Sequence, residues 1–156
     1  MRPGSSPLRR STPPSTSICA TCTVIGPGTI TGNGSASAGV RGTIKATVAN
    51  VTITGNGSGV VAHTFDQRGT VVVRDSIIIG NQFHGVDADR GAKVKDSIIS
   101  GSGLNGINML RCDGRSRVTV RDSTLSASGG DPVCGDAITC ADIAMCNGPP
   151  RLLGDV

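Results

Sequence analysis

The chain has 156 residues, of which 37% are hydrophobic. This length is enough for one domain with a core and too short for two large domains. It contains no Trp or Tyr and only two Phe, Phe65 and Phe83, so the core has to be aliphatic. The formal charge is +4, but three Arg lie in the first ten residues and the remainder carries 12 basic against 11 acidic side chains. This balance and the scarcity of aromatics argue against a nucleic-acid partner.

The first segment, residues 1–18, is rich in Pro, Ser and Arg and has little to bury, which predicts a disordered tail. It lacks the apolar stretch of a signal peptide. No run in the chain reaches the 18 or so consecutive apolar residues of a membrane span, so we expect none. Regular structure is expected to begin near Cys19.

From there the chain repeats itself. The heptapeptide TITGNGS occurs at residues 29–35 and again at residues 52–58. With its central Ile as the anchor, a first aliphatic column follows at steps of 23, 25, 21 and 26 residues: Ile30, Ile53, Ile78, Ile99 and Leu125. The same steps give a second column at Ile25, Val48, Val73, Val94 and Val120. A third column, in which a Gly precedes the first four members, is Val40, Val60, Val86, Ile107 and Ile138.

Three short apolar segments per repeat, separated by Gly or Asn, predict a parallel β-solenoid whose coils stack at about 4.8 Å. We expect it to cover residues 19–146 in about five coils of 21–26 residues. Residues 147–156 read as an irregular C-terminal end with no cap, as if a longer helix had been truncated. Uncapped coils expose strand edges, which favours end-to-end self-association.

The segments VRDSIIIGN…GV, VKDSIISGS…GI and VANVTITGN…GV resemble the repeats of right-handed parallel β-helix proteins of the pectin-lyase-like superfamily, over roughly residues 22–138. The resemblance implies an all-β, right-handed parallel β-helix. It narrows function little, because that superfamily includes polysaccharide lyases, glycoside hydrolases, epimerases, viral spike proteins and adhesins.

A polar column follows the second aliphatic column and reads Pro27, Asn50, Asp75, Asp96 and Asp122, directly preceded by Ala49, Arg74, Lys95 and Arg121. Stacked carboxylates repel one another, and the basic column would compensate them. We interpret these residues as a structural ladder of turn residues and ion pairs. A calcium-binding row is the functional alternative, because Asp oxygens suit that cation.

A second charged cluster lies in the turns DQRG, DADRG and RCDGR. By resemblance to lyases of the superfamily, Asp66, Asp87 and Asp89 would hold calcium against the carboxylate of a uronate. Arg68, Arg90 or Lys93 would act as the base that removes the proton α to that carboxylate. Ordinary turn pairing is the simpler interpretation. His63 and His84 fall in different columns, and each is interpreted as a surface or turn residue.

Six cysteines favour structural disulfides in an oxidising compartment over a zinc site, without fixing their pairing. They are Cys19, Cys22, Cys112, Cys134, Cys140 and Cys146. Cys19 and Cys22 form a CxxC in which a disulfide could close the first coil. The composition therefore predicts an extracellular or cell-surface protein.

The function expected from the sequence is a non-catalytic recognition or scaffold module for carbohydrate, with no resident cofactor. Because Trp and Tyr are absent, recognition would be polar, through the Asp and Arg rows. The alternative is a calcium-assisted polysaccharide lyase or uronate epimerase acting on acidic polysaccharide. A second alternative is a structural segment of a large adhesin. The Thr-x-Thr row ends after two coils, which argues against ice binding.

Overall fold

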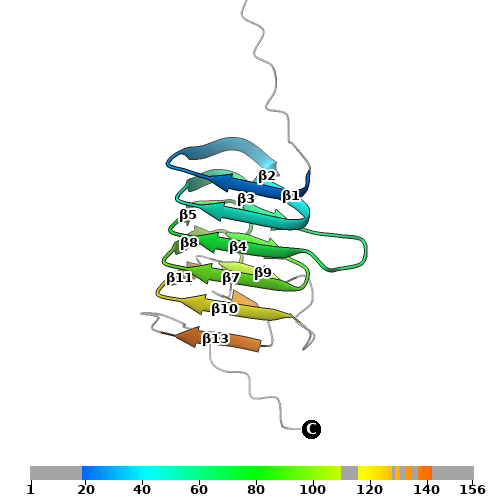
Figure 1. Ribbon diagram of the computed structural model, residues 1–156. Coiled ribbons are helices and arrows are strands. Elements are labelled where there is room, and N and C mark those ends of the chain that lie inside the picture. Colours follow the sequence, from blue (N-terminus) through cyan, green and yellow to red (C-terminus); the bar gives the residue numbers. More distant parts are fainter. Residues whose placement is uncertain (1–18, 110–115, 128, 131–132, 135–136, 142–156) are drawn as a thin grey trace, which may run out of the picture.

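The computed structural model describes residues 19–109, 116–127, 129–130, 133–134 and 137–141. Within these residues the chain is all-β and forms 13 strands without a helix. All strand pairs are parallel, and successive coils stack into a β-solenoid of about four turns (Figure 1). The predicted fold class is therefore confirmed.

Each coil contributes to three faces. The first face, toward the viewer in Figure 1, contains β1 (Cys19–Ile25), the end of β2 (Thr29–Ala49), β4 (Thr70–Arg74), β7 (Gly91–Lys95), β10 (Arg117–Arg121) and β13 (Ala137–Ala141). The second face contains the starts of β2 and of β3 (Thr52–Ala62), then β5 (Ile77–Ile79), β8 (Ile98–Ser102) and β11 (Thr124–Ala127). The third face contains later parts of β2 and β3, then β6 (Val86–Ala88), β9 (Ile107–Met109) and β12 (Val133–Cys134).

The aliphatic columns form the core. The first column pairs as predicted, from Ile30 through Ile53, Ile78 and Ile99 to Leu125. The second column begins at Val24 and not at Ile25, which is 73% exposed, because the turn after β1 is one residue longer than its later equivalents. The third column ends at Val133, since Ile138 pairs with Val118 on the first face. These two members were wrongly predicted.

The count of about five coils was also too high. The five anchors of the first column enclose four complete steps, which are the four turns of the structure. The predicted tail at residues 1–18 and the predicted irregular end at residues 147–156 lie outside the described residues.

Glycines precede the third face because no Cβ fits there. A Cβ at Gly39, Gly59 or Gly85 would overlap a core Ile side chain of the first column. The recurring Gly before the third column is thus a packing requirement of the solenoid interior.

The corner between the first and second faces is the same in successive coils. Asn50, Asp75, Asp96 and Asp122 adopt positive φ of 47–58° there, a conformation that Asn and Asp tolerate better than other side chains. A buried serine follows each Asp, at Ser76, Ser97 and Ser123. Each hydroxyl donates to the carbonyl two residues earlier and accepts an N–H from the preceding coil, as Ser97 Oγ does from Ser76 N at 3.1 Å.

These bonds support the structural interpretation of the Asp column. Of the column's Asp residues, Asp96 has a neighbouring cation within ion-pair distance in the described part of the chain, Lys95 Nζ at 3.2 Å. The serine ladder was not predicted from the sequence. We call this corner, with its Asx residues and serines, the serine corner.

A buried asparagine ladder runs along the corner between the second and third faces. The Oδ1 of Asn56 accepts from Asn33 Nδ2 at 2.9 Å, and the Oδ1 of Asn81 accepts from Asn56 N at 3.1 Å. Asn56 and Asn81 are each 2% exposed, so the ladder satisfies amide groups that would otherwise be buried without partners. The next coil has Ser102 in this corner.

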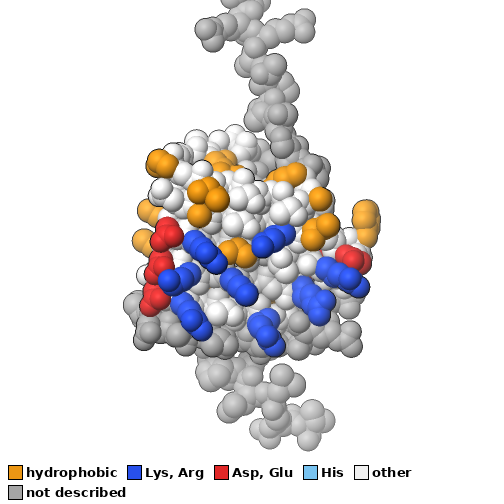
Figure 2. All heavy atoms as spheres, viewed as in Figure 1, with side chains coloured by type: hydrophobic (Ala, Val, Ile, Leu, Met, Phe, Trp, Pro, Cys, Tyr) orange, Lys and Arg blue, Asp and Glu red, His pale blue; other side chains and the backbone are white. Residues whose placement is uncertain are grey.

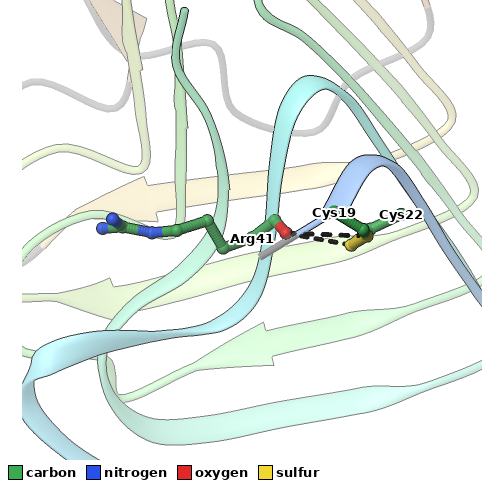
Figure 3. The surroundings of a disulfide bond; sticks show 3 residues. All are labelled: Cys19, Cys22 and Arg41. Carbon is green, nitrogen blue, oxygen red and sulfur yellow. Dashed lines mark hydrogen bonds between the residues drawn. A yellow bond between two sulfur atoms is a disulfide. The ribbon is translucent and has the colours of Figure 1, made fainter. Parts of the chain in front are cut away.

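The first strand carries a disulfide between Cys19 and Cys22, whose Cα atoms are 5.5 Å apart (Figure 3). The bond joins two residues of β1 and is therefore local, rather than a closure of the whole first coil. The β1–β2 register shifts between Cys19 and Thr21. The Sγ of Cys22 lies 2.9 Å from the Arg41 carbonyl oxygen. Cys112 and Cys146 lie outside the described residues, and the side chains of Cys134 and Cys140 are not described.

In the part of the chain that the structure describes, no helix has the length and apolar character required to cross a membrane.

Candidate polar groove on the third face

Three of the four positions in one column of the third face carry polar side chains. Arg41, Val61, Asp87 and Asn108 occupy equivalent positions in successive coils. The chain alternates along these short strands, so Val86 and Ala88 point into the core while Asp87 points outward. The fold therefore brings a cation, a carboxylate and an amide onto one surface.

Asp87 is the centre of this column. Its Oδ1 accepts a hydrogen bond from Asn108 Nδ2 at 2.8 Å and lies 3.2 Å from His63 Nε2. The Asp87 side chain is 14% exposed and that of His63 is 36% exposed. Asn108 Oδ1 in turn accepts from Asn105 Nδ2 of the same coil at 3.1 Å, so the polar contacts from His63 through Asp87 to Asn108 and Asn105 involve three successive coils.

The pKa values of the pair shift in opposite directions. The hydrogen bond to Asp87 raises the pKa of His63 above its ordinary value, against the opposing effect of partial burial. Burial alone would raise the pKa of Asp87, but the hydrogen bonds from His63 and Asn108 outweigh it, so that this pKa is lowered. The contact thus favours an ionised Asp87 and a protonated His63.

A depression, which we call the groove, adjoins the pair of Asp87 and His63. It is lined by Asp87 and His63, by Arg41 and Phe83, and by hydroxyl-bearing or small residues of β2 and β3: Ser35, Ala36, Ser37, Ala38, Ser58 and Val61. Phe83 is 40% exposed. The surface offers a carboxylate, a guanidinium, hydroxyls and a partly exposed ring to whatever occupies it.

A loop at residues 63–69 borders the groove and projects beside the stack between β3 and β4 (Figure 1). Asp89, which is 4% exposed, holds it, because its Oδ2 accepts from Thr64 N at 2.6 Å and Gly69 N at 3.2 Å. Thr64 Oγ1 donates to Asp66 Oδ1 at 2.6 Å within the loop. Phe65 is fully exposed at 111%.

The structure separates the residues predicted to form a calcium-assisted lyase site. Asp87 faces the groove, Asp89 is buried under the loop, and Asp66 pairs with Arg68 on the exposed side of the loop at 3.2 Å. Lys93 points outward from β7 on the first face, and Arg90 is exposed directly before β7. Within the described ranges, no three His, Cys or acidic side chains are grouped as metal ligands.

Three residues of the groove were not singled out from the sequence as site residues: Arg41, His63 and Asn108. His63 lies directly after β3 and reaches Asp87 in the next coil, 24 positions along the chain. The repeat itself carried the signal, because aligning the coils places Arg41, Asp87 and Asn108 in one outward column. His84 is a turn residue whose Nδ1 accepts from Asn105 N at 3.3 Å.

Comparisons of the chain with protein-family models, with curated proteins and with solved structures find no match.

Proposed function

We propose that the protein is a non-catalytic β-solenoid recognition module that binds carbohydrate in the groove around Asp87. The observation that carries the proposal is a largely buried carboxylate, oriented by His63 and Asn108, beside hydroxyls, Arg41 and Phe83. Carboxylates and guanidinium groups recognise sugar hydroxyls through directed hydrogen bonds, and a partly exposed ring can pack on a sugar face.

The groove favours recognition over catalysis. A lyase or epimerase of the kind expected from the resemblance would need its carboxylates together, whereas Asp89 is committed to the loop and Asp66 to Arg68. Membership in the pectin-lyase-like superfamily, an extracellular location and end-to-end self-association remain part of the proposal.

The test is retention on a panel of neutral and uronate polysaccharides, with calcium or with EDTA, while the absorbance of unsaturated products is recorded. We expect retention on at least one polysaccharide without product. Phe83→Ala, a surface change, should weaken retention by about 5- to 10-fold, and Asp87→Ala by at least as much. Ser100→Ala on the second face is the matched control and should bind normally.

Two results would contradict the proposal. Calcium-dependent product that is lost in Asp87→Ala would make the protein a lyase. Absence of retention on every polysaccharide from a folded sample would favour a purely structural coil segment.

A further inference from the structure

The first face is strongly cationic. The outward positions of its strands carry six cations and no acid in the described residues: Lys45, Arg74, Lys93, Lys95, Arg117 and Arg121. Figure 2 shows these cations spread across the front of the molecule. The charge is therefore concentrated on one side, although the formal net charge of the chain is only +4.

A row of acidic side chains follows one edge of this face. Asp75, Asp96 and Asp122 lie at its border with the second face, where Figure 2 shows acidic side chains in a row. Lys95 pairs with Asp96 at 3.2 Å, and the described residues hold no other ion pair to a cation of this face. Five cations of the face thus have no carboxylate of the described chain within ion-pair distance.

The same face also exposes large apolar side chains. Ile25 is 73% exposed and lies in the same outward column as Arg74, through the pairs Ile25 with Ala49 and Ala49 with Arg74. Ile44 is 55% exposed and directly precedes Lys45. Exposed Ile beside unpaired cations is not needed for the core, which is complete without them.

The arrangement is planar. Neighbouring coils are about 4.8 Å apart and alternate residues of a strand are about 6.7 Å apart, so the cations form a grid over the sheet rather than a single line. Phe65 lies in the loop beside the stack, and Phe83 borders the groove of the third face. The first face therefore has no ring on which a base or sugar could stack.

We propose that the first face docks onto an anionic lipid bilayer, with its cations against the head groups and with Ile25 and Ile44 at the interface. An anionic bilayer is a planar polyanion that also accepts apolar side chains, so it matches both properties of the face. Cations near such a surface contribute roughly additively, over a distance set by a Debye length of about 8 Å at physiological salt.

The experiment is co-sedimentation of the whole chain with neutral phosphatidylcholine vesicles and with mixed phosphatidylcholine–phosphatidylglycerol vesicles. We expect binding only to the mixed vesicles, weakening as salt is added. The triple variant Arg74→Gln, Lys95→Gln, Arg121→Gln should bind on the order of 10-fold or more weakly. Its matched control removes three cations from the N-terminal segment, Arg2→Gln, Arg9→Gln and Arg10→Gln, and should bind nearly normally.

Two further variants separate lipid from other polyanions. Ile25→Ser with Ile44→Ser should reduce vesicle binding several-fold at every salt concentration, because apolar insertion is not screened. Ile98→Ser, 43% exposed on the second face, is its control. Changing Asp75, Asp96 and Asp122 to Asn keeps a residue that tolerates positive φ and should strengthen binding.

The proposal is overturned if mixed vesicles do not bind, or if the N-terminal control loses as much affinity as the first-face triple variant. It is also overturned if heparin or duplex DNA is retained at salt concentrations that abolish vesicle binding, with no effect of the two Ile substitutions. Phe83→Ala should leave vesicle binding intact, so this proposal can fail independently of carbohydrate recognition in the groove.

Discussion

Two corners of the solenoid behave differently along the chain. At the serine corner, the first-column residue follows the second-column Val by five positions in each coil after the first turn, as from Val73 to Ile78 and from Val94 to Ile99. The turn after β1, from Val24 to Ile30, is one position longer. At the corner between the third and first faces, eight residues separate Val86 from Val94, but thirteen separate Val60 from Val73. Nearly all the variation in length between these coils is therefore placed in one corner.

The difference has a physical cause. The serines of this corner are buried, and each hydroxyl is bonded once within its own coil and once to the preceding coil, so that an extra residue would disrupt both bonds. The corner between the third and first faces opens to solvent, and in the longer coil its loop is held by Asp89, through Thr64 N and Gly69 N, and by the contact of Asp87 with His63. Additional residues in this corner cost little stability. The loop at residues 63–69, which makes the longer coil longer, borders the groove.

The largest expected effect comes from breaking the serine corner. Ser97→Ala removes the acceptor of Ser76 N and the donor to the Lys95 carbonyl, which leaves a buried N–H without a partner. We expect the free energy of unfolding to fall by about 1–3 kcal/mol, measured by urea denaturation. Ser100→Ala, outward on β8, should change it by less than about 0.5 kcal/mol. Equal losses in both variants would show that the ladder does not stabilise the corner.

A smaller and more local effect is expected at the corner between the third and first faces, which we call the open corner. Asp89→Ala removes the acceptor for Thr64 N and Gly69 N, so the loop should open while the coils stay folded. Trypsin cleavage after Arg68 should then become several-fold faster, with a smaller change in melting temperature than Ser97→Ala causes. Asp122→Asn, on another corner, serves as the control. An unchanged cleavage rate would mean that Asp89 does not hold the loop.

The smallest effect concerns the pH dependence of the groove. The pKa of His63 is raised in the fold, so its contact with Asp87 stabilises fully below the ordinary value of 6.5 and is lost as pH rises through the folded pKa. The pKa of Asp87 is lowered, so its contribution is present above 3.8 and is lost as pH falls through the folded pKa. The pair therefore stabilises most between these two ordinary values.

Melting temperature should fall slightly between about pH 6 and about pH 8, and His63→Gln should flatten this change. Because the imidazole is about one-third exposed, we expect only a few tenths of a kcal/mol. His84→Gln is the comparison variant. A slope that persists in His63→Gln would place the titrating group elsewhere.

The repeat allowed most of the fold to be predicted. Columns anchored on Ile30 and Val48 were recoverable because buried positions in stacked coils demand the same kind of side chain. The two errors lie where the repeat length changes. The longer turn after β1 makes Val24, and not Ile25, the first member of the second column. The third column ends at Val133, and Ile138 belongs to the first face. Periodicity identifies stacked positions, but it cannot show where a single turn gains a residue.

The groove was less predictable, for a related reason. Asp87 was a candidate because, by resemblance to lyases of the superfamily, acids in these turns would hold calcium, but its partner His63 lies in another coil and outside every aliphatic column. Nothing in the sequence distinguishes Asp89, which is buried as a loop anchor, from Asp87, which faces outward. The alternation of a three-residue strand decides this, and its register becomes clear only when the neighbouring coils are aligned.

The serine corner also has a consequence for how such a chain can lengthen. At this corner the serine hydroxyl of each coil accepts an N–H from the coil before it, and the N–H of the same serine donates to the hydroxyl of the coil after it. An in-frame duplication of one such coil would therefore create a junction identical to those already present. The solenoid can gain length by copying a single genetic unit, while the open corner diversifies independently.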